Sequence, residues 1–162
     1  DLADEFGFFF LNGFAMKSAT EGGVLSFTRS SGSLADHVIT RGRTESESIE
    51  SLTSFTGQAF RCSTEVQPLM YMPEDWVVLM PKEAWEFDES TPKVSTSGLI
   101  QGGVLQRGEG RVAVFGEAAM FTAQTSIRGG KVRQMGMNHP SARENAQFVL
   151  NVMRWLSGQI ND

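Results

Sequence analysis

Most apolar residues of the chain fall into short runs that end at glycine, proline or small polar residues. Runs of this length with β-branched and aromatic side chains are typical of strands rather than of helices. Residues 82–94 do not fit this strand pattern, because Trp85 and Phe87 lie among acidic residues there. This composition predicts a surface excursion. We expect strands at 8–11, 24–28, 49–55 and 76–80.

The run Val112–Phe115 is apolar at every position. A strand with one face in water alternates apolar and polar residues, so this run predicts a central strand covered on both faces. Residues 99–106 precede it across the glycine-bearing connection Arg107–Gly110, and this order predicts a β-hairpin. We therefore expect a mixed sheet rather than a purely parallel one.

One helix has a clear pattern, near the end of the chain. Apolar residues recur there at steps of three and four, which predicts an amphipathic helix that packs on the sheet. Ser141 with Glu144 three residues later is the pattern of a capping box, and Gly158 is a typical helix stop. Strands with a packed helix predict an α/β fold. The expected buried face consists of Ala142, Ala146, Val149, Val152, Met153 and Leu156.

Composition narrows the class of protein. A length of 162 residues without an internal repeat or a linker predicts a single domain over residues 1–162. The net charge is −5 and the basic residues are scattered, which argues against nucleic-acid binding. No run approaches the roughly 20 apolar residues of a membrane span. Cys62 is the only cysteine, which excludes an intrachain disulfide and a multi-thiolate metal site.

The start of the sequence predicts missing upstream structure. Residues 1–6 followed by Gly7 are typical of the last turn of a helix. We expect a soluble protein whose compartment stays open, with export on a signal peptide upstream of Asp1 as one alternative. Five phenylalanines between Phe6 and Phe14 predict core packing, or a contact between two copies of the chain.

Glu117 is the foremost candidate for chemistry, because it directly follows the apolar run and Gly116. In open α/β sheets ligands bind in the crevice outside the carboxyl ends of the strands, and Glu117 would lie there. A carboxylate in this position suits a general base, a cation ligand or a hydroxyl acceptor. The alternative is a cap at the start of a following helical turn.

Other candidates are weaker. His37 and His139 are the only histidines and are candidate acid–base groups, although the sequence favours a structural turn at His37 and a helix-entry position for His139. Gln58, Gln124 and Asn138 are candidate ligand-binding neighbours of Glu117. With two histidines and no cysteine cluster we predict no metal site and no cofactor, while an oxygen-ligated cation at Glu117 stays an alternative.

Two segments, GRVAVFGEAAMFTAQ and NAQFVLNVMRWLSG, resemble the end of class I glutamine amidotransferase-like domains of an uncharacterised bacterial family. Related domains occur in accessory proteins of gliding-type ABC transporters, and LADHVITRGR and SFTGQAF are also similar to this family. The resemblance implies a flavodoxin-like, three-layer α/β/α fold whose first units lie upstream of Asp1. It implies no amidotransferase activity here, because the Gly-x-Cys-x-Gly elbow and the His-x-Glu pair are missing from the sequence.

Three hypotheses follow. The first is a non-catalytic amidotransferase-like domain that binds a small polar ligand or a protein partner at the strand-end crevice around Glu117. The second is a hydrolase that uses Glu117 with His37 or His139, with or without a divalent cation. The third is a purely structural or interaction domain in which the phenylalanine-rich start pairs two copies.

Overall fold

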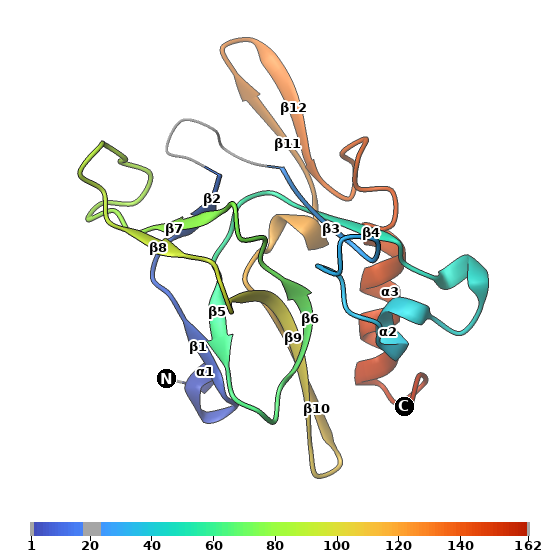
Figure 1. The fold of residues 1–162 in the computed structure, drawn as a ribbon. Helices are drawn as coiled ribbons and strands as arrows, with labels where there is room; N and C mark the ends of the chain where they lie inside the picture. Colours follow the sequence, from blue (N-terminus) through green and yellow to red (C-terminus); the bar gives the residue numbers. More distant parts are fainter. Residues whose placement is uncertain (1, 18–23, 162) are drawn as a thin grey trace.

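The computed structural model describes residues 2–17 and 24–161. Its largest sheet has five antiparallel strands, with β9 in the middle (Figure 1). One edge of β9 pairs with β6, and the other pairs with β10 and, beyond the end of β10, with β5. β1 pairs with the free side of β5. The strands of this sheet are β1 (Phe8–Phe10), β5 (Phe60–Cys62), β6 (Gln67–Tyr71), β9 (Ile100–Arg107) and β10 (Gly110–Phe115).

Three smaller antiparallel sheets surround this one, and in Figure 1 the hairpin β11–β12 projects away from the rest of the chain. β7 lies between β2 and β8, while β3 pairs with β4 and β11 with β12. Their bounds are β2 (Phe14–Met16), β3 (Leu25–Thr28), β4 (Ser51–Ser54), β7 (Val77–Leu79), β8 (Lys93–Ser95), β11 (Ala123–Arg128) and β12 (Lys131–Gly136).

Helices are few and short in the described residues, apart from the last one. α3 packs beside β10 and β4, as Figure 1 shows on the side of the molecule where the C-terminus lies. None of these helices has the length and apolar composition needed to cross a membrane, within the residues described, which agrees with the sequence. The helices are α1 (Leu2–Glu5), α2 (Val38–Arg41), η1 (Glu45–Glu47), η2 (Ala119–Phe121) and α3 (Asn145–Leu156).

The predicted α/β class, with its flavodoxin-like three-layer α/β/α architecture and mixed sheet, is wrong. Every strand pair in the described chain is antiparallel, and the fold is predominantly β. A parallel pair needs a crossover of a dozen or more residues, usually a helix. The helices between described strands are only three or four residues long, and α3 follows the last strand. The chain therefore turns back on itself between strands.

Most expected strands are confirmed, but the central strand is not the expected one. The hairpin across Arg107 and Gly110 is present as β9–β10. β9 is buried along most of its length because Val104 packs in one core cluster and its neighbour Leu105 in another. β10 lies at the sheet edge, and its apolar residues are only half-buried. Full burial on both faces therefore belongs to β9, whereas β10 is half-buried on both faces.

The C-terminal helix is confirmed, but its buried face and its start differ from the prediction. Asn145, Phe148, Asn151 and Trp155 are buried beside Val152, whereas the predicted Met153 and Leu156 are exposed. The capping box does not form, because Ser141 Oγ contacts His139 and the Glu144 carboxylate accepts hydrogen bonds from the backbone N–H groups of residues 50 and 51. Asn145 and Asn151 are buried by hydrogen bonding, which an apolar pattern does not detect.

The phenylalanine-rich start packs largely within the chain. Phe8 is fully buried against Phe60, with ring centroids 5.8 Å apart, and the Phe10 ring lies 4.7 Å from the same partner. Phe9 is 44% exposed. α1 ends at Glu5 and Gly7 takes a left-handed φ of 76°, which confirms the expected helix end, while Asp1 lies outside the described residues. Pairing of two copies through this segment stays a prediction.

Candidate functional site

The end of β10 is held against the loop that follows β4. Gln58 N donates to Gly116 O at 2.7 Å, and Gly116 N donates to Gln101 O at 2.8 Å. A Cβ atom on Gly116 would lie 1.9 Å from Gln58 O, so only glycine permits this approach. The contact brings Glu117 next to Gly57 and Gln58, which are remote from it in the sequence.

Glu117 is buried and its carboxylate accepts backbone hydrogen bonds. Ala119 N donates to Oε1 at 2.6 Å, Met120 N donates to Oε2 at 2.7 Å, and Phe55 N lies 3.4 Å from Oε2. The first two donors belong to η2, where unpaired N–H groups at a helix start need acceptors. Glu117 therefore caps η2 and ties it to the β4 loop, which is the alternative that the sequence left open.

A fully buried glutamine fixes the other end of this loop. Gln101, in β9, accepts a 2.6 Å hydrogen bond from Ser54 Oγ and donates to Thr56 O at 2.7 Å. Its Nε2 also lies 3.4 Å from Gln58 O. Buried polar networks whose members are all paired are rigid. The loop over residues 55–58 is thus positioned from both sides, by Gln101 and by Glu117.

A cavity of about 380 Å³ opens beside this loop, and we call it the Glu117 cavity. Three of the sequence-predicted residues line it together: Glu117, Gln58 and Gln124. Aromatic side chains form another part of its wall, with the Phe14 and Trp85 rings 4.4 Å apart. The remaining lining residues are Asn12, Gly13, Phe55, Gly57, Ala119 and Met135.

Asn138 lies next to this cavity rather than in its wall. Its Nδ2 donates to Gln124 O at 3.2 Å, so it supports the start of β11. Its Oδ1 is buried and has no hydrogen-bond partner within the described part of the chain. The structure therefore connects all four predicted ligand-binding residues, three directly at the cavity and Asn138 through Gln124.

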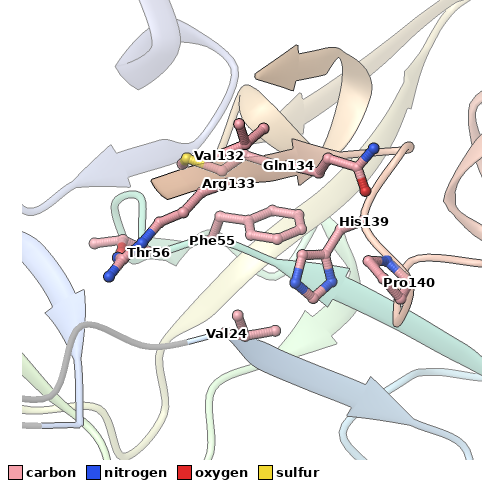
Figure 2. Close-up of a pocket in the computed structure, with 9 residues that line it drawn as sticks. Val24, Phe55, Thr56, Val132, Arg133, Gln134, His139 and Pro140 are labelled. Carbon is pink, nitrogen blue, oxygen red and sulfur yellow. The ribbon is translucent and has the colours of Figure 1, made fainter. Parts of the chain in front are cut away.

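A second hollow of about 730 Å³, the β12 groove, adjoins the first and shares Phe55 and Met135 with it. Figure 2 shows β12, with Val132 and Gln134, on one side and His139 and Pro140 on the other. The full lining is Val24, Phe55, Thr56, Val132, Arg133, Gln134, Met135, His139 and Pro140.

The two histidines do not join Glu117. His139 lines the β12 groove, where its ring lies 5.2 Å from that of Phe55 and its Nδ1 is 2.6 Å from Ser141 Oγ. His37 is the N-cap of α2, with Nδ1 accepting from Ile39 N at 3.2 Å. Neither histidine is among the residues that line the Glu117 cavity, so the hydrolase hypothesis gains no support from its lining.

The two cavities hold the strained residues of the backbone. Thr56, with a φ of 89°, lines the β12 groove, and Trp85, with a φ of 70°, lines the Glu117 cavity. No other non-glycine residue that the structure describes has a positive φ. A β-branched or bulky residue in this region costs roughly 1–3 kcal/mol, and such strain clusters at functional sites.

Sequence reasoning missed the aromatic wall and the loop network. The sequence predicts a surface excursion for Trp85, and a tryptophan among charged residues is the signal that could have indicated a contact site. Gln101 carried no signal, because a glutamine within a strand has no distinctive pattern. Cys62 is half-buried, and burial raises the pKa of its thiol, which is the opposite of what an activated nucleophile needs.

Among the described residues, no three His, Cys, Asp or Glu side chains group together in a way that would hold a metal ion. Comparisons of the chain with known protein families, with curated proteins and with solved structures find no match.

Proposed function

We propose that the chain is a non-catalytic binding domain that holds a small, neutral, polar ligand in the Glu117 cavity. The observation that carries this proposal is the meeting of Gln58, Gln124 and Glu117 with the Phe14–Trp85 pair around one cavity. A volume of about 380 Å³ falls within the range of small-molecule sites, which combine apolar walls with a few polar groups.

The lining argues for a neutral ligand. No Lys, Arg or His lines the cavity in the described chain, so nothing there pairs with an anion. The single carboxylate, Glu117, already accepts short hydrogen bonds from Ala119 and Met120, which leaves little capacity for a cation. The amides of Gln58 and Gln124 both donate and accept, which suits hydroxyl or amide groups.

The aromatic wall adds a requirement for a flat or apolar ligand face. Trp85 is 64% exposed, although an indole of this size gains free energy by burial. Its left-handed backbone holds the ring beside Phe14 at the cavity wall. A saccharide, which has hydroxyl edges and apolar C–H faces, combines these properties better than a nucleotide or a free amino acid.

The test is a thermal-shift screen of monosaccharides, disaccharides, nucleotides, amino acids and divalent ions, followed by calorimetric titration of each hit. A ligand at about 100 times its Kd stabilises the protein by roughly 2.7 kcal/mol. We expect a neutral hydroxyl-bearing compound to bind, and its affinity to fall at least tenfold in Gln124→Ala and Trp85→Gly. Glycine at position 85 removes the indole and suits the left-handed φ.

The matched control is Gln106→Ala, which removes an exposed glutamine from β9 away from the cavity. It should leave both the melting temperature and the affinity unchanged. The proposal fails if no neutral compound binds, or if a hit binds equally well to the wild type and to both cavity variants.

A further inference from the structure

The outer edge of β12 is unpaired in the described structure. β12 forms a two-stranded sheet with β11, in register from Arg128–Lys131 to Ala123–Gly136, and no other described strand pairs with it. An open strand edge offers a row of N–H and C=O groups to another strand, and natural proteins usually cover or blunt such edges.

The turn of the hairpin determines which groups point outward. Gly129 and Gly130 have φ values of 56° and 73°, as a two-residue type I′ turn requires. Paired and unpaired positions alternate along an antiparallel ladder, starting from the bonded pair next to the turn. Val132 and Gln134 therefore direct their backbone N–H and C=O groups away from β11.

This edge faces the β12 groove. Four consecutive residues, 132–135, line the groove. Successive side chains of a strand point to opposite faces, so four consecutive lining residues indicate that the edge of β12, and not one of its faces, borders the groove. The opposite wall includes the apolar side chains of Val24, Phe55 and Pro140 (Figure 2). Val132 is 66% exposed and Val24 is 51% exposed, so apolar surface lies on both sides of the open edge.

Among the described residues, the groove is lined by basic residues and by no acidic ones. Its lining contains Arg133 and His139 and no acidic residue. The hairpin segment 123–136 contains no Asp or Glu, although the whole chain has a net charge of −5. A local cationic strand on an acidic protein favours an acidic partner.

We propose that the free edge of β12 binds an extended peptide of alternating apolar and acidic residues by strand addition. The peptide backbone pairs with Val132 and Gln134, one side of the peptide packs on the exposed residues Val24 and Pro140, and its carboxylates lie near Arg133. Strand addition of this kind takes affinity from main-chain hydrogen bonds and specificity from alternate side chains. A second copy of the chain fits less well, because pairing β12 with itself in the register that joins Val132 to Gln134 sets the two Arg133 residues opposite one another.

The experiment uses a fluorescein-labelled seven-residue peptide that alternates glutamate and valine, with binding measured by fluorescence anisotropy. Its counterpart alternates lysine and valine. We expect the acidic peptide to bind at least tenfold more tightly, and this preference to shrink as the salt concentration rises. Equal binding of the two peptides overturns the proposal.

Two N-methylated versions of the acidic peptide test the hydrogen bonding without altering the protein. One carries methyl groups on its odd amides and the other on its even amides. Only one set of amides faces β12 in a strand pair, so one version should lose at least tenfold in affinity and the other should keep it. Equal affinity of both methylated versions and the parent peptide overturns strand addition.

Two substitutions then locate the site. Arg133→Glu should reverse the preference toward the lysine peptide, whereas Arg61→Glu, on the exposed face of β5, should not. Val132→Pro removes one outward N–H and should weaken the acidic peptide at least tenfold, since an edge strand tolerates proline there. Sedimentation equilibrium of the protein alone gives the remaining outcome: a dimer that Val132→Pro abolishes would assign the edge to a second copy and overturn the proposal.

Discussion

Replacing Glu117 with glutamine separates the structural role of this carboxylate from a role in ligand contact. The side chain is 7% exposed, and its two oxygens accept hydrogen bonds from Ala119 N at 2.6 Å and Met120 N at 2.7 Å. Glutamine has nearly the same shape but only one accepting oxygen. Its NH₂ group would therefore face one of these buried N–H donors, and that donor would lose its partner.

The size of the effect follows from burial. A buried donor left without a partner costs about 1–3 kcal/mol, and hydrogen bonds to a charged acceptor contribute about 1.5–3 kcal/mol against about 1 kcal/mol for neutral ones. We expect Glu117→Gln to lower the free energy of unfolding by about 2–4 kcal/mol. An exposed helix cap would cost only about 1 kcal/mol. For a protein of this length, a loss of about 3 kcal/mol lowers Tm by roughly 6–12 °C.

The assay is urea denaturation followed by tryptophan fluorescence, with the m-value checked for constancy between variants. The control, Glu109→Gln, removes the same charge from the exposed β9–β10 turn and should stay within about 0.5 kcal/mol of the wild type. A Glu117→Gln protein as stable as this control would refute the capping argument. Loss of ligand binding at unchanged stability would assign the carboxylate to the ligand instead.

Three further changes test the parts of the fold that hold the site. Asn145→Ala removes three hydrogen bonds from a fully buried side chain and should cost about 2–4 kcal/mol in urea denaturation, whereas a loss below 1 kcal/mol would contradict this account. Gly116→Ala forces a Cβ to within 1.9 Å of a backbone oxygen and should cost about 3 kcal/mol or prevent folding, while Gly110→Ala, with its nearest atom at 3.4 Å, should be mild. Hydrogen bonds from Arg43 hold the pKa of Glu47 at about 2, below its ordinary 4.5, so the carboxylate stabilises the fold above pH 4.5 and this stabilisation disappears as the pH falls to about 2. The stability difference between the wild type and Glu47→Gln, measured by urea denaturation from pH 7 to 2, should therefore shrink within that window, and a constant difference would count against the ion pair.

The positions of strands could be predicted from the sequence because they depend on local patterns. The apolar runs at 49–55 and 76–80 and the turn at Arg107–Gly110 all correspond to observed strands or turns. Their arrangement could not be predicted in the same way. A short apolar strand is compatible with a parallel or an antiparallel neighbour, and the choice depends on connections that a local pattern does not describe. The resemblance filled this gap with a flavodoxin-like topology, and the antiparallel pairing contradicts it.

The edge position of β10 could not be predicted from its local sequence pattern either. Phe115 packs against Phe121 and Phe148, with ring centroids 4.8 and 5.6 Å apart, so the apolar run does contact a core. An edge strand that packs on both faces has the same sequence pattern as a central one. Only the number of paired neighbours distinguishes an edge strand from a central one. In this chain the central strand is β9, the partner of β10.

The candidate site could be located from the sequence only where a residue follows a strand end. Glu117 was found in this way, and Gln58 and Gln124 do lie with it in one cavity. The strained residues Thr56 and Trp85 could not be found, because a non-glycine residue with a positive φ has no sequence pattern. Such conformations persist only where the surroundings over-determine them.

Hydrogen bonds on both sides of Thr56 hold this residue in its strained conformation. Gln101 binds the carbonyl of Thr56 at 2.7 Å, and Gln58 N binds Gly116 O at 2.7 Å, so the loop is fixed on both sides of the strained residue. The free energy that maintains the strain therefore comes from the fold, not from a ligand. A cavity wall fixed in this way is preformed, and a preformed site loses less conformational entropy on binding than a loop that must first become ordered. The Glu117 cavity should accordingly bind its ligand without backbone rearrangement of residues 55–58, and amide hydrogen exchange of this loop should be slow already in the free protein.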